Sequence, residues 1–188
     1  MDKEMIIVLD FGGQYNQLIA RRVRECNVYC EVQPYTISIE ELKKKNPKGI
    51  ILTGGPNSVC GPKGLFPNQQ LWEMGIPILG ICYGAQLITY VLGGKVSPAP
   101  SNEYGKTEIL VDSKECLFKG MEDTEIMWMS HSDHIEIMPE GFHVTAHTTV
   151  CPVAAMENPE KKMYGTQFHP EVMHSVKGKE LLANFVYG

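Results

Sequence analysis

The sequence lacks a surplus of basic residues. Its 188 residues include 17 Lys and Arg against 22 Asp and Glu, which gives a net charge of −5 with histidine neutral. Proteins that bind nucleic acid usually carry excess positive charge that neutralises phosphates. The composition therefore argues against nucleic acid as a partner, while 43% apolar residues are enough for the core of one compact domain.

The sequence also lacks a membrane span or a secretion signal of the usual form. The longest uncharged stretch, residues 74–94, is interrupted by Pro77 and five glycines, so it predicts a buried strand, a turn and a helix. The apolar run at residues 5–9 is too short for the core of a signal peptide. We therefore expect a cytoplasmic protein that does not associate with membranes.

No Cys-x-x-Cys pair occurs among the six cysteines, which lie at positions 26, 30, 60, 82, 116 and 151. Their spacing is not typical of a zinc site, and a chain of this length does not need disulfides to fold. We expect reduced thiols and no bound metal.

Short apolar runs alternate with helical patterns in the first half of the chain. Strands are predicted over residues 5–9, 28–32, 49–52 and 76–81, and helices over residues 15–26, 39–45 and 84–92. This order predicts an α/β fold with an open, mostly parallel sheet that has helices on both faces.

The second half of the chain has a different pattern of apolar residues. Shorter β-like runs lie at residues 107–111, 125–129, 143–148, 153–156 and 163–168, and a helix is predicted over residues 179–186. We expect a smaller mixed or antiparallel β part within one domain over residues 1–188, with His131 and His134 in a polar turn. The basic run Arg21, Arg22 and Arg24 is expected to be a solvated helix face, with a docking surface as the alternative.

The pentad Gly80-Ile81-Cys82-Tyr83-Gly84 lies between a predicted strand and a predicted helix and has the form of a nucleophile elbow. The nucleophile in such a turn has a strained backbone, and the flanking glycines let the strand and the helix approach each other. A helix N-terminus also stabilises a thiolate. The alternative is a buried structural cysteine.

A histidine and a carboxylate follow about 87 residues later, in the segment Gln167-Phe168-His169-Pro170-Glu171. Two residues apart in extended backbone, His169 and Glu171 share one face, so the carboxylate can orient the imidazole. With a distant nucleophile this pair would complete a Cys-His-acid triad. Without one, the segment would be an ordinary strand end.

A glycine turn, Thr-Gly-Gly-Pro-Asn-Ser, occupies residues 53–58 at the end of the third predicted strand. Open α/β sheets bind ligands at this edge, and backbone N–H groups of such a turn can stabilise an oxyanion. A phosphate cradle is the alternative, but neither of the usual glycine-rich nucleotide motifs follows.

Taken in this order, the elbow cysteine, the Gly-Gly-Pro turn and the His-x-Glu segment resemble the class I, or triad, glutamine amidotransferase domains over essentially the whole chain. Within that family the GMP synthetases are the most similar, over residues 10–12, 14–15, 17–25, 103–105, 128–131, 151–156 and 164–171. The resemblance implies a flavodoxin-like fold, with Cys82 as nucleophile, His169 as base and Glu171 as its orienter. It also implies an oxyanion hole formed by the backbone N–H groups of Gly55 and Tyr83.

The resemblance further implies a glutamine pocket lined by Gln86, Ser130, His131, Ser132 and Asp133. The sequence departs from the family at Ser132, where glycine is usual, and at Ala85, where a bulkier residue is usual.

The implied activity is hydrolysis of glutamine to glutamate and ammonia, with no cofactor in this domain. In the family, the ammonia passes to an ATP-pyrophosphatase domain that uses ATP and Mg to aminate XMP to GMP, and the full-length enzyme is expected to be a homodimer. The Ser-Gly-Gly-x-Asp-Ser loop of that second domain does not occur here. We therefore expect an excised domain, which the end at Gly188 favours, or a separate subunit.

Three other functions remain alternatives: an amidotransferase subunit of another synthase, a stand-alone thiol hydrolase of the same fold, and a non-catalytic glutamine-responsive interaction module. The complete set of Cys82, His169 and Glu171 argues against the non-catalytic module. Tyr83, where the related hydrolases commonly have histidine, argues against the hydrolase.

Overall fold

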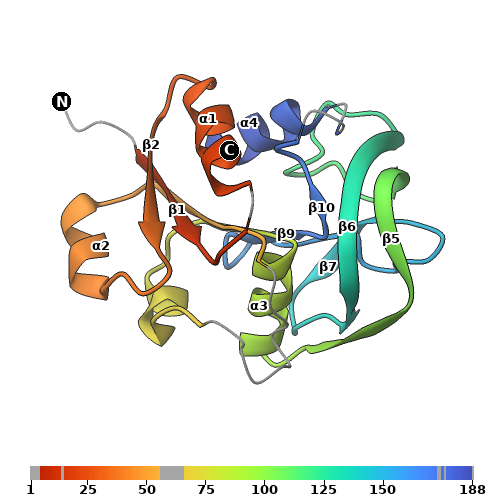
Figure 1. The fold of residues 1–188 in the computed structure, drawn as a ribbon, viewed down its shortest axis with the longest axis horizontal. Helices are drawn as coiled ribbons and strands as arrows, with labels where there is room; N and C mark the ends of the chain where they lie inside the picture. The colour runs from red at the N-terminus through yellow and green to blue at the C-terminus, as the bar shows by residue number, and fades with distance from the viewer. Residues whose placement is uncertain (1–4, 14, 56–65, 173–174, 176, 188) are drawn as a thin grey trace.

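The computed structural model describes residues 5–13, 15–55, 66–172, 175 and 177–187, with the backbone alone at residues 99–103, 130–132 and 187. Ten strands lie in this part of the chain: β1 (Met5–Asp10), β2 (Tyr29–Pro34), β3 (Gly49–Leu52), β4 (Ile78–Ile81), β5 (Lys95–Val111), β6 (Thr124–Ile137), β7 (His143–His147), β8 (Ala155–Asn158), β9 (Met163–Thr166) and β10 (Phe168–His169). The helices are α1 (Asn16–Arg24), α2 (Ile39–Lys45), α3 (Tyr83–Val91), α4 (Gly178–Tyr187) and the short 3₁₀ helix η1 (Gln69–Glu73) (Figure 1).

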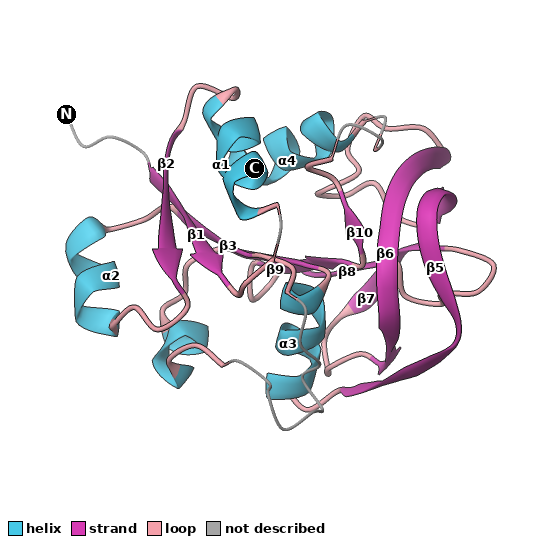
Figure 2. Cartoon of the chain, viewed as in Figure 1, coloured by secondary structure: helices cyan, strands magenta, loops and turns pink. Residues whose placement is uncertain are grey.

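All ten strands join one sheet, in the order β10-β6-β5-β7-β8-β9-β4-β3-β1-β2. The strands β2, β1, β3, β4 and β9 run parallel to one another. Every pairing from β9 through β8, β7, β5 and β6 to β10 is antiparallel. The predicted α/β fold class is confirmed. The antiparallel part continues the parallel one through β9, so the two share a single sheet (Figure 2).

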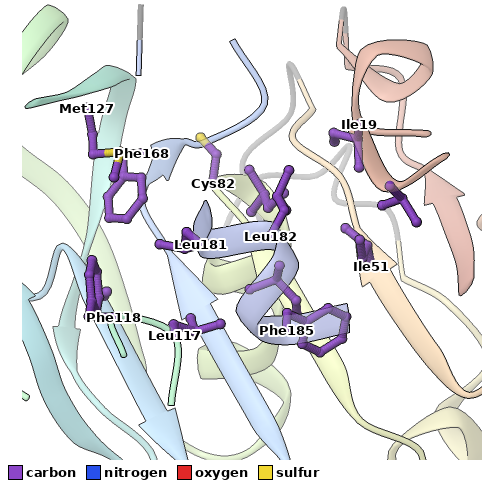
Figure 3. Packing of buried hydrophobic residues seen from close by; sticks show 14 of the residues in the cluster. Ile19, Ile51, Cys82, Leu117, Phe118, Met127, Phe168, Leu181, Leu182 and Phe185 are labelled. Carbon is purple, nitrogen blue, oxygen red and sulfur yellow. The ribbon is translucent and has the colours of Figure 1, made fainter. Parts of the chain in front are cut away.

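Apolar side chains bury both faces of the parallel part. In β1, Val8 packs with Ile19 of α1 and Leu182 of α4, whereas Ile7 and Leu9 pack on the opposite side of the sheet. Figure 1 shows α1 and α4 together on one face and α2 and α3 on the other, and Figure 3 shows the cluster beneath α1 and α4. Continuous apolar strands of this kind need cover on both faces. Within the described residues, no helix is both long and apolar enough to cross a membrane.

The boundaries of α2 follow from its capping residues. Ser38 has extended backbone and its hydroxyl accepts a hydrogen bond from Glu41 N at 3.2 Å, and Asn46 ends the helix in the left-handed conformation with φ 47°. Serine favours the first position and asparagine tolerates the second. The helix therefore spans the predicted residues.

The long strands β5 and β6 correct one prediction. They are 17 and 14 residues long and pair with each other. The backbones of His131 and His134 are paired with Glu103 and Ser97, so these histidines lie within β6 and the predicted polar turn is wrong. A ribbon that extends past the body of a sheet has solvent on its faces and needs no apolar alternation. Tyr104, which is 64% exposed on β5, illustrates this. The polar residues around His131 and His134 therefore lack the apolar alternation from which a strand is predicted.

Candidate active site

The chain reverses sharply at Cys82, between the end of β4 and the start of α3. Cys82 has φ 54° and ψ −102°, a conformation that costs a non-glycine residue about 1–3 kcal/mol. A Cβ added at Gly80 would lie 2.7 Å from Ala85 N, and one added at Gly84 would lie 2.7 Å from the Leu52 Cβ. Only glycine fits at both positions, so the strained elbow predicted from the pentad is confirmed.

The neighbouring strand β9 brings the predicted base to the elbow. Ile81 is paired with Thr166, and Cys82 N donates a hydrogen bond to Thr166 O at 2.7 Å. The chain then leaves β9 and enters β10, where His169 is paired with Trp128 of β6. The turn of the chain between β9 and β10 therefore places His169 next to Cys82.

Cys82, His169 and Glu171 form a buried hydrogen-bonded series. The Nδ1 atom of His169 lies 2.7 Å from Oε1 of Glu171, whose side chain is fully buried, and the Cys82 side chain hydrogen-bonds to the imidazole. Burial by itself lowers the pKa of His169, but the negative charge of Glu171 and hydrogen bonds with Cys82 and Glu171 outweigh it, and the pKa of His169 is raised well above its ordinary value. The arrangement favours an imidazolium beside the thiol.

A cavity of about 280 Å³ opens beside these residues. Cys82, His169 and Gly55 line it, as does Gly54, where an added Cβ would lie 3.1 Å from Cε1 of His169 and 3.6 Å from the Cβ of Cys82. Tyr83 is the first residue of α3, where backbone N–H groups point toward the N-terminal end of the helix. Of the two predicted oxyanion donors, Gly55 thus lines the cavity and Tyr83 is adjacent to Cys82, which lines it. Residues 56–58 of the predicted glycine turn lie outside the described residues.

The predicted glutamine-binding residues fall on α3 and β6. Gln86 is 4% exposed, and its Nε2 donates to Asp133 O at 3.2 Å and to Oε1 of Gln167 at 3.3 Å. Gln86 is not among the described residues that line the cavity. Ser130, His131 and Ser132 precede Asp133 in β6, and their side chains lie outside the described part of the structure. Their role in binding glutamine stays a prediction.

Gln167 is a buried neighbour of Cys82 that sequence reasoning missed. It is fully buried, accepts the bond from Gln86, and its Nε2 lies 3.5 Å from the backbone oxygen of Cys82. Its position in an otherwise apolar run, two residues before His169, was the available signal.

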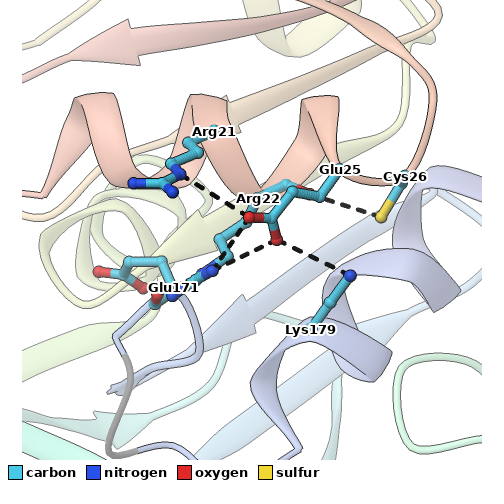
Figure 4. A network of polar contacts seen from close by, with 6 residues as sticks. All are labelled: Arg21, Arg22, Glu25, Cys26, Glu171 and Lys179. Atoms are coloured by element: carbon cyan, nitrogen blue, oxygen red, sulfur yellow. Dashed lines mark hydrogen bonds and ion pairs between the residues drawn. The ribbon is translucent and has the colours of Figure 1, made fainter.

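The basic face of α1 agrees with the prediction only in part, because Arg21 and Arg24 are exposed but Arg22 is partly buried. Arg22 lies beside Glu171 (Figure 4), and its Nε donates to Glu171 O at 3.1 Å. Arg24 donates to Cys30 O at 2.8 Å, so neither side chain is merely solvated. Tyr15, which precedes α1, places its ring 5.6 Å from the ring of His169 in an edge-on contact. The Arg22 and Tyr15 contacts join residues about 150 positions apart, which no local pattern reveals.

Comparisons with known proteins agree with this geometry. The family model for class-I glutamine amidotransferases matches residues 7–188. Two proteins named GMP synthase [glutamine-hydrolyzing], from Clostridium botulinum and Acetivibrio thermocellus, are 58% and 59% identical over 187 residues. The alignments cover 100% of this chain but 36% and 37% of those proteins, so the chain spans about a third of their length.

Solved structures give the same result. A Thermoplasma acidophilum protein, described as one of the subunits of a GMP synthase, superposes with a TM-score of 0.88 at 31% identity, covering 100% of this chain and 94% of that one. A glutamine amidotransferase from Thermotoga maritima has a TM-score of 0.73 at 20% identity, with 92% and 78% of the two chains covered. The second similarity concerns the fold alone.

Proposed function

This chain belongs to the class-I glutamine amidotransferase family, and from that membership we propose that it hydrolyses glutamine and supplies the ammonia for amination of XMP to GMP. The observation that carries the proposal is the buried series of Cys82, His169 and Glu171 at one cavity, with a 2.7 Å bond between the last two. The similarity to glutamine-hydrolysing GMP synthases over the whole chain supports the choice of acceptor.

The proposed reaction has two steps. The Cys82 thiolate attacks the side-chain amide carbon of glutamine, and His169 gives its proton to the departing ammonia, leaving a thioester. Water then adds to the thioester as His169 takes its proton, and glutamate leaves as the thiolate is restored. Glu171 holds the ring and stabilises its charged form.

The backbone supplies the remaining parts of the proposed site. The N–H groups of Gly55 and Tyr83 would stabilise the oxyanion of each tetrahedral intermediate. Two observations support this: Gly55 lines the same cavity as Cys82, and Tyr83 follows Cys82 at the start of α3. We assign the glutamine pocket to Gln86 and to the β6 segment Ser130, His131, Ser132 and Asp133. The bond from Gln86 to Asp133 O supports that grouping, because it ties α3 to this part of β6.

Amination of XMP, the proposed acceptor of the ammonia, requires a second domain or subunit. The partner we propose is an ATP-pyrophosphatase, in the form of a separate chain or a further domain, which would bind ATP, Mg and XMP within an enzyme that is a homodimer at full length. An amidotransferase domain over residues 1–188 and a cytoplasmic location are the accompanying proposals. The size of the relatives supports a partner of this kind, since this chain aligns with only 36% of their length.

A titration tests the proposal. Glutamate release by this chain should be slow alone and should rise when an XMP-loaded, ATP-supplied synthetase domain is added, because free ammonia release wastes glutamine. The matched control is Cys82→Ala with the same partner, which should aminate XMP from added ammonia but not from glutamine. Rapid glutamine hydrolysis that the partner leaves unchanged would favour a stand-alone hydrolase.

A further inference from the structure

Side chains from outside the triad hold the backbone of the His-Pro-Glu segment. Arg22 Nε donates to the carbonyl oxygen of Glu171 at 3.1 Å. At the other end, Ser175 Oγ donates to the carbonyl oxygen of His169 at 2.5 Å and accepts from Trp128 N at 2.8 Å. The two residues of the catalytic pair are therefore fixed from α1 and from β6.

We propose that Arg22 is a positioning residue of the triad, which holds the Glu171 backbone so that its carboxylate stays aligned with His169. The inference rests on the proposed glutamine hydrolysis. Its main support is the state of the carboxylate: Oε1 bonds to His169, whereas the buried Oε2 has no hydrogen-bond partner among the described residues. With a single hydrogen bond on the side chain, the direction of the carboxylate depends on where the backbone is held.

Arg22 is itself held in place. Its side chain is 23% exposed, and its guanidinium contacts Glu25 at 3.2 Å. Glu25 also lies 3.8 Å from Arg21 and 3.8 Å from Lys179 of α4 (Figure 4). The guanidinium thus joins an ion-pair network on one side to the Glu171 backbone on the other.

The helix that carries Arg22 contacts the triad at a second place. The ring of Tyr15, next to the first residue of α1, lies edge-on to the ring of His169. Among the described residues, the titratable groups that face His169 are Cys82, Glu171 and Tyr15. Any displacement of α1 changes the surroundings of both His169 and Glu171.

Substitutions at Arg22, Arg21 and Glu25 separate the positioning role of Arg22 from loss of the ion pairs. Arg22→Gln removes the bond to Glu171 and the pair with Glu25, whereas Arg21→Gln and Glu25→Gln weaken the ion-pair network and keep the bond to Glu171. In glutamine hydrolysis, Arg22→Gln should lower kcat about 10- to 100-fold with KM unchanged, the size of effect that a small misplacement of a catalytic group produces. Arg21→Gln should stay near wild type. Glu25→Gln removes one anchor of the Arg22 guanidinium and should lose less activity than Arg22→Gln, and Arg22→Lys should recover part of the loss.

The pH profile gives a readout that a structural role would not move. Iodoacetamide alkylates a cysteine as its thiolate, and a neighbouring imidazolium favours that form. Since Glu171 raises the pKa of His169 against the effect of burial, misalignment lowers that pKa, and alkylation of Arg22→Gln should begin at higher pH. Peptide mapping confirms that Cys82 carries the label.

The outcomes distinguish this inference from the function on which it rests. A profile and kcat for Arg22→Gln that match those of Arg21→Gln overturn the positioning role, as does a loss of activity with an unchanged alkylation profile. If the wild-type chain fails to hydrolyse glutamine even with its partner, the proposed function fails. The alkylation comparison still decides the role of Arg22, because it requires no turnover.

Discussion

Replacing Glu171 with glutamine separates the position of this side chain from its charge. Glutamine has nearly the same shape, and its amide oxygen can accept the bond from Nδ1 of His169 that Oε1 now accepts at 2.7 Å. Burial of His169, which lowers its pKa, is unchanged in this variant. The negative charge of Glu171, which contributes most to raising that pKa, is lost. The pKa of His169 should therefore fall, and less imidazolium should face Cys82 at neutral pH.

The size of the effect follows from the kind of bond that is weakened. A hydrogen bond to a charged group contributes about 1.5–3 kcal/mol, and about 1.4 kcal/mol corresponds to tenfold, so kcat should fall about 10- to 150-fold. His169→Ala removes the general acid and base altogether, which costs about 10²–10⁴ in rate. We therefore expect Glu171→Gln to retain more activity than His169→Ala.

The assay is kcat for glutamate release by both variants in the presence of the synthetase partner. Circular dichroism and urea unfolding show whether each variant is folded, and alkylation of Cys82 against pH reports the thiolate. If folded Glu171→Gln loses as much activity as His169→Ala or more, Glu171 does more than orient the ring, and the roles of the pair must be reassigned.

Three further predictions concern the elbow and one buried carboxyl. Cys82→Ala should abolish glutamine hydrolysis in a folded protein, and a glutamine-analogue electrophile should label the wild type once, at Cys82, by peptide mass mapping. Cys82→Gly should be more stable to urea than Cys82→Ala by about 1 kcal/mol, because strain of about 1–3 kcal/mol at φ 54° exceeds the entropic cost of glycine; the reverse order would contradict a strained elbow. Burial raises the pKa of Glu157, so the wild-type free energy of unfolding should fall as pH rises above about 4.3, and Glu157→Gln should lack that slope in urea titrations across pH.

Local patterns were enough wherever a short segment determines its own structure. The capping residues Ser38 and Asn46 fix α2, and the pentad around Cys82 contains both glycines that the elbow needs. The contact between His169 and Glu171 was also predicted from their spacing, but β10 ends at His169 and the contact forms across a turn at Pro170 and Glu171, not along extended backbone.

Long-range contacts were not predictable in the same way. The β6 segment that contains His131 is polar and becomes a strand only because β5 pairs with it. Arg22 lies 149 positions from Glu171, and its sequence context is that of any exposed basic helix face. Arg22 acquires its proposed role from the contact of its side chain with the Glu171 backbone, which no periodicity encodes.

The pairing of β4 with β9 has a consequence for the order of folding. Cys82 and Gln167 are 85 positions apart, and the bond from Cys82 N to Thr166 O joins strands that belong to distant parts of the chain. Closing so long a loop in a parallel pairing is slow compared with forming local helices. During refolding, helical circular dichroism should return early, whereas glutamine hydrolysis should return with the slowest phase. A nascent or half-folded chain would therefore carry an inert thiol, and ammonia release would begin only when the sheet is complete.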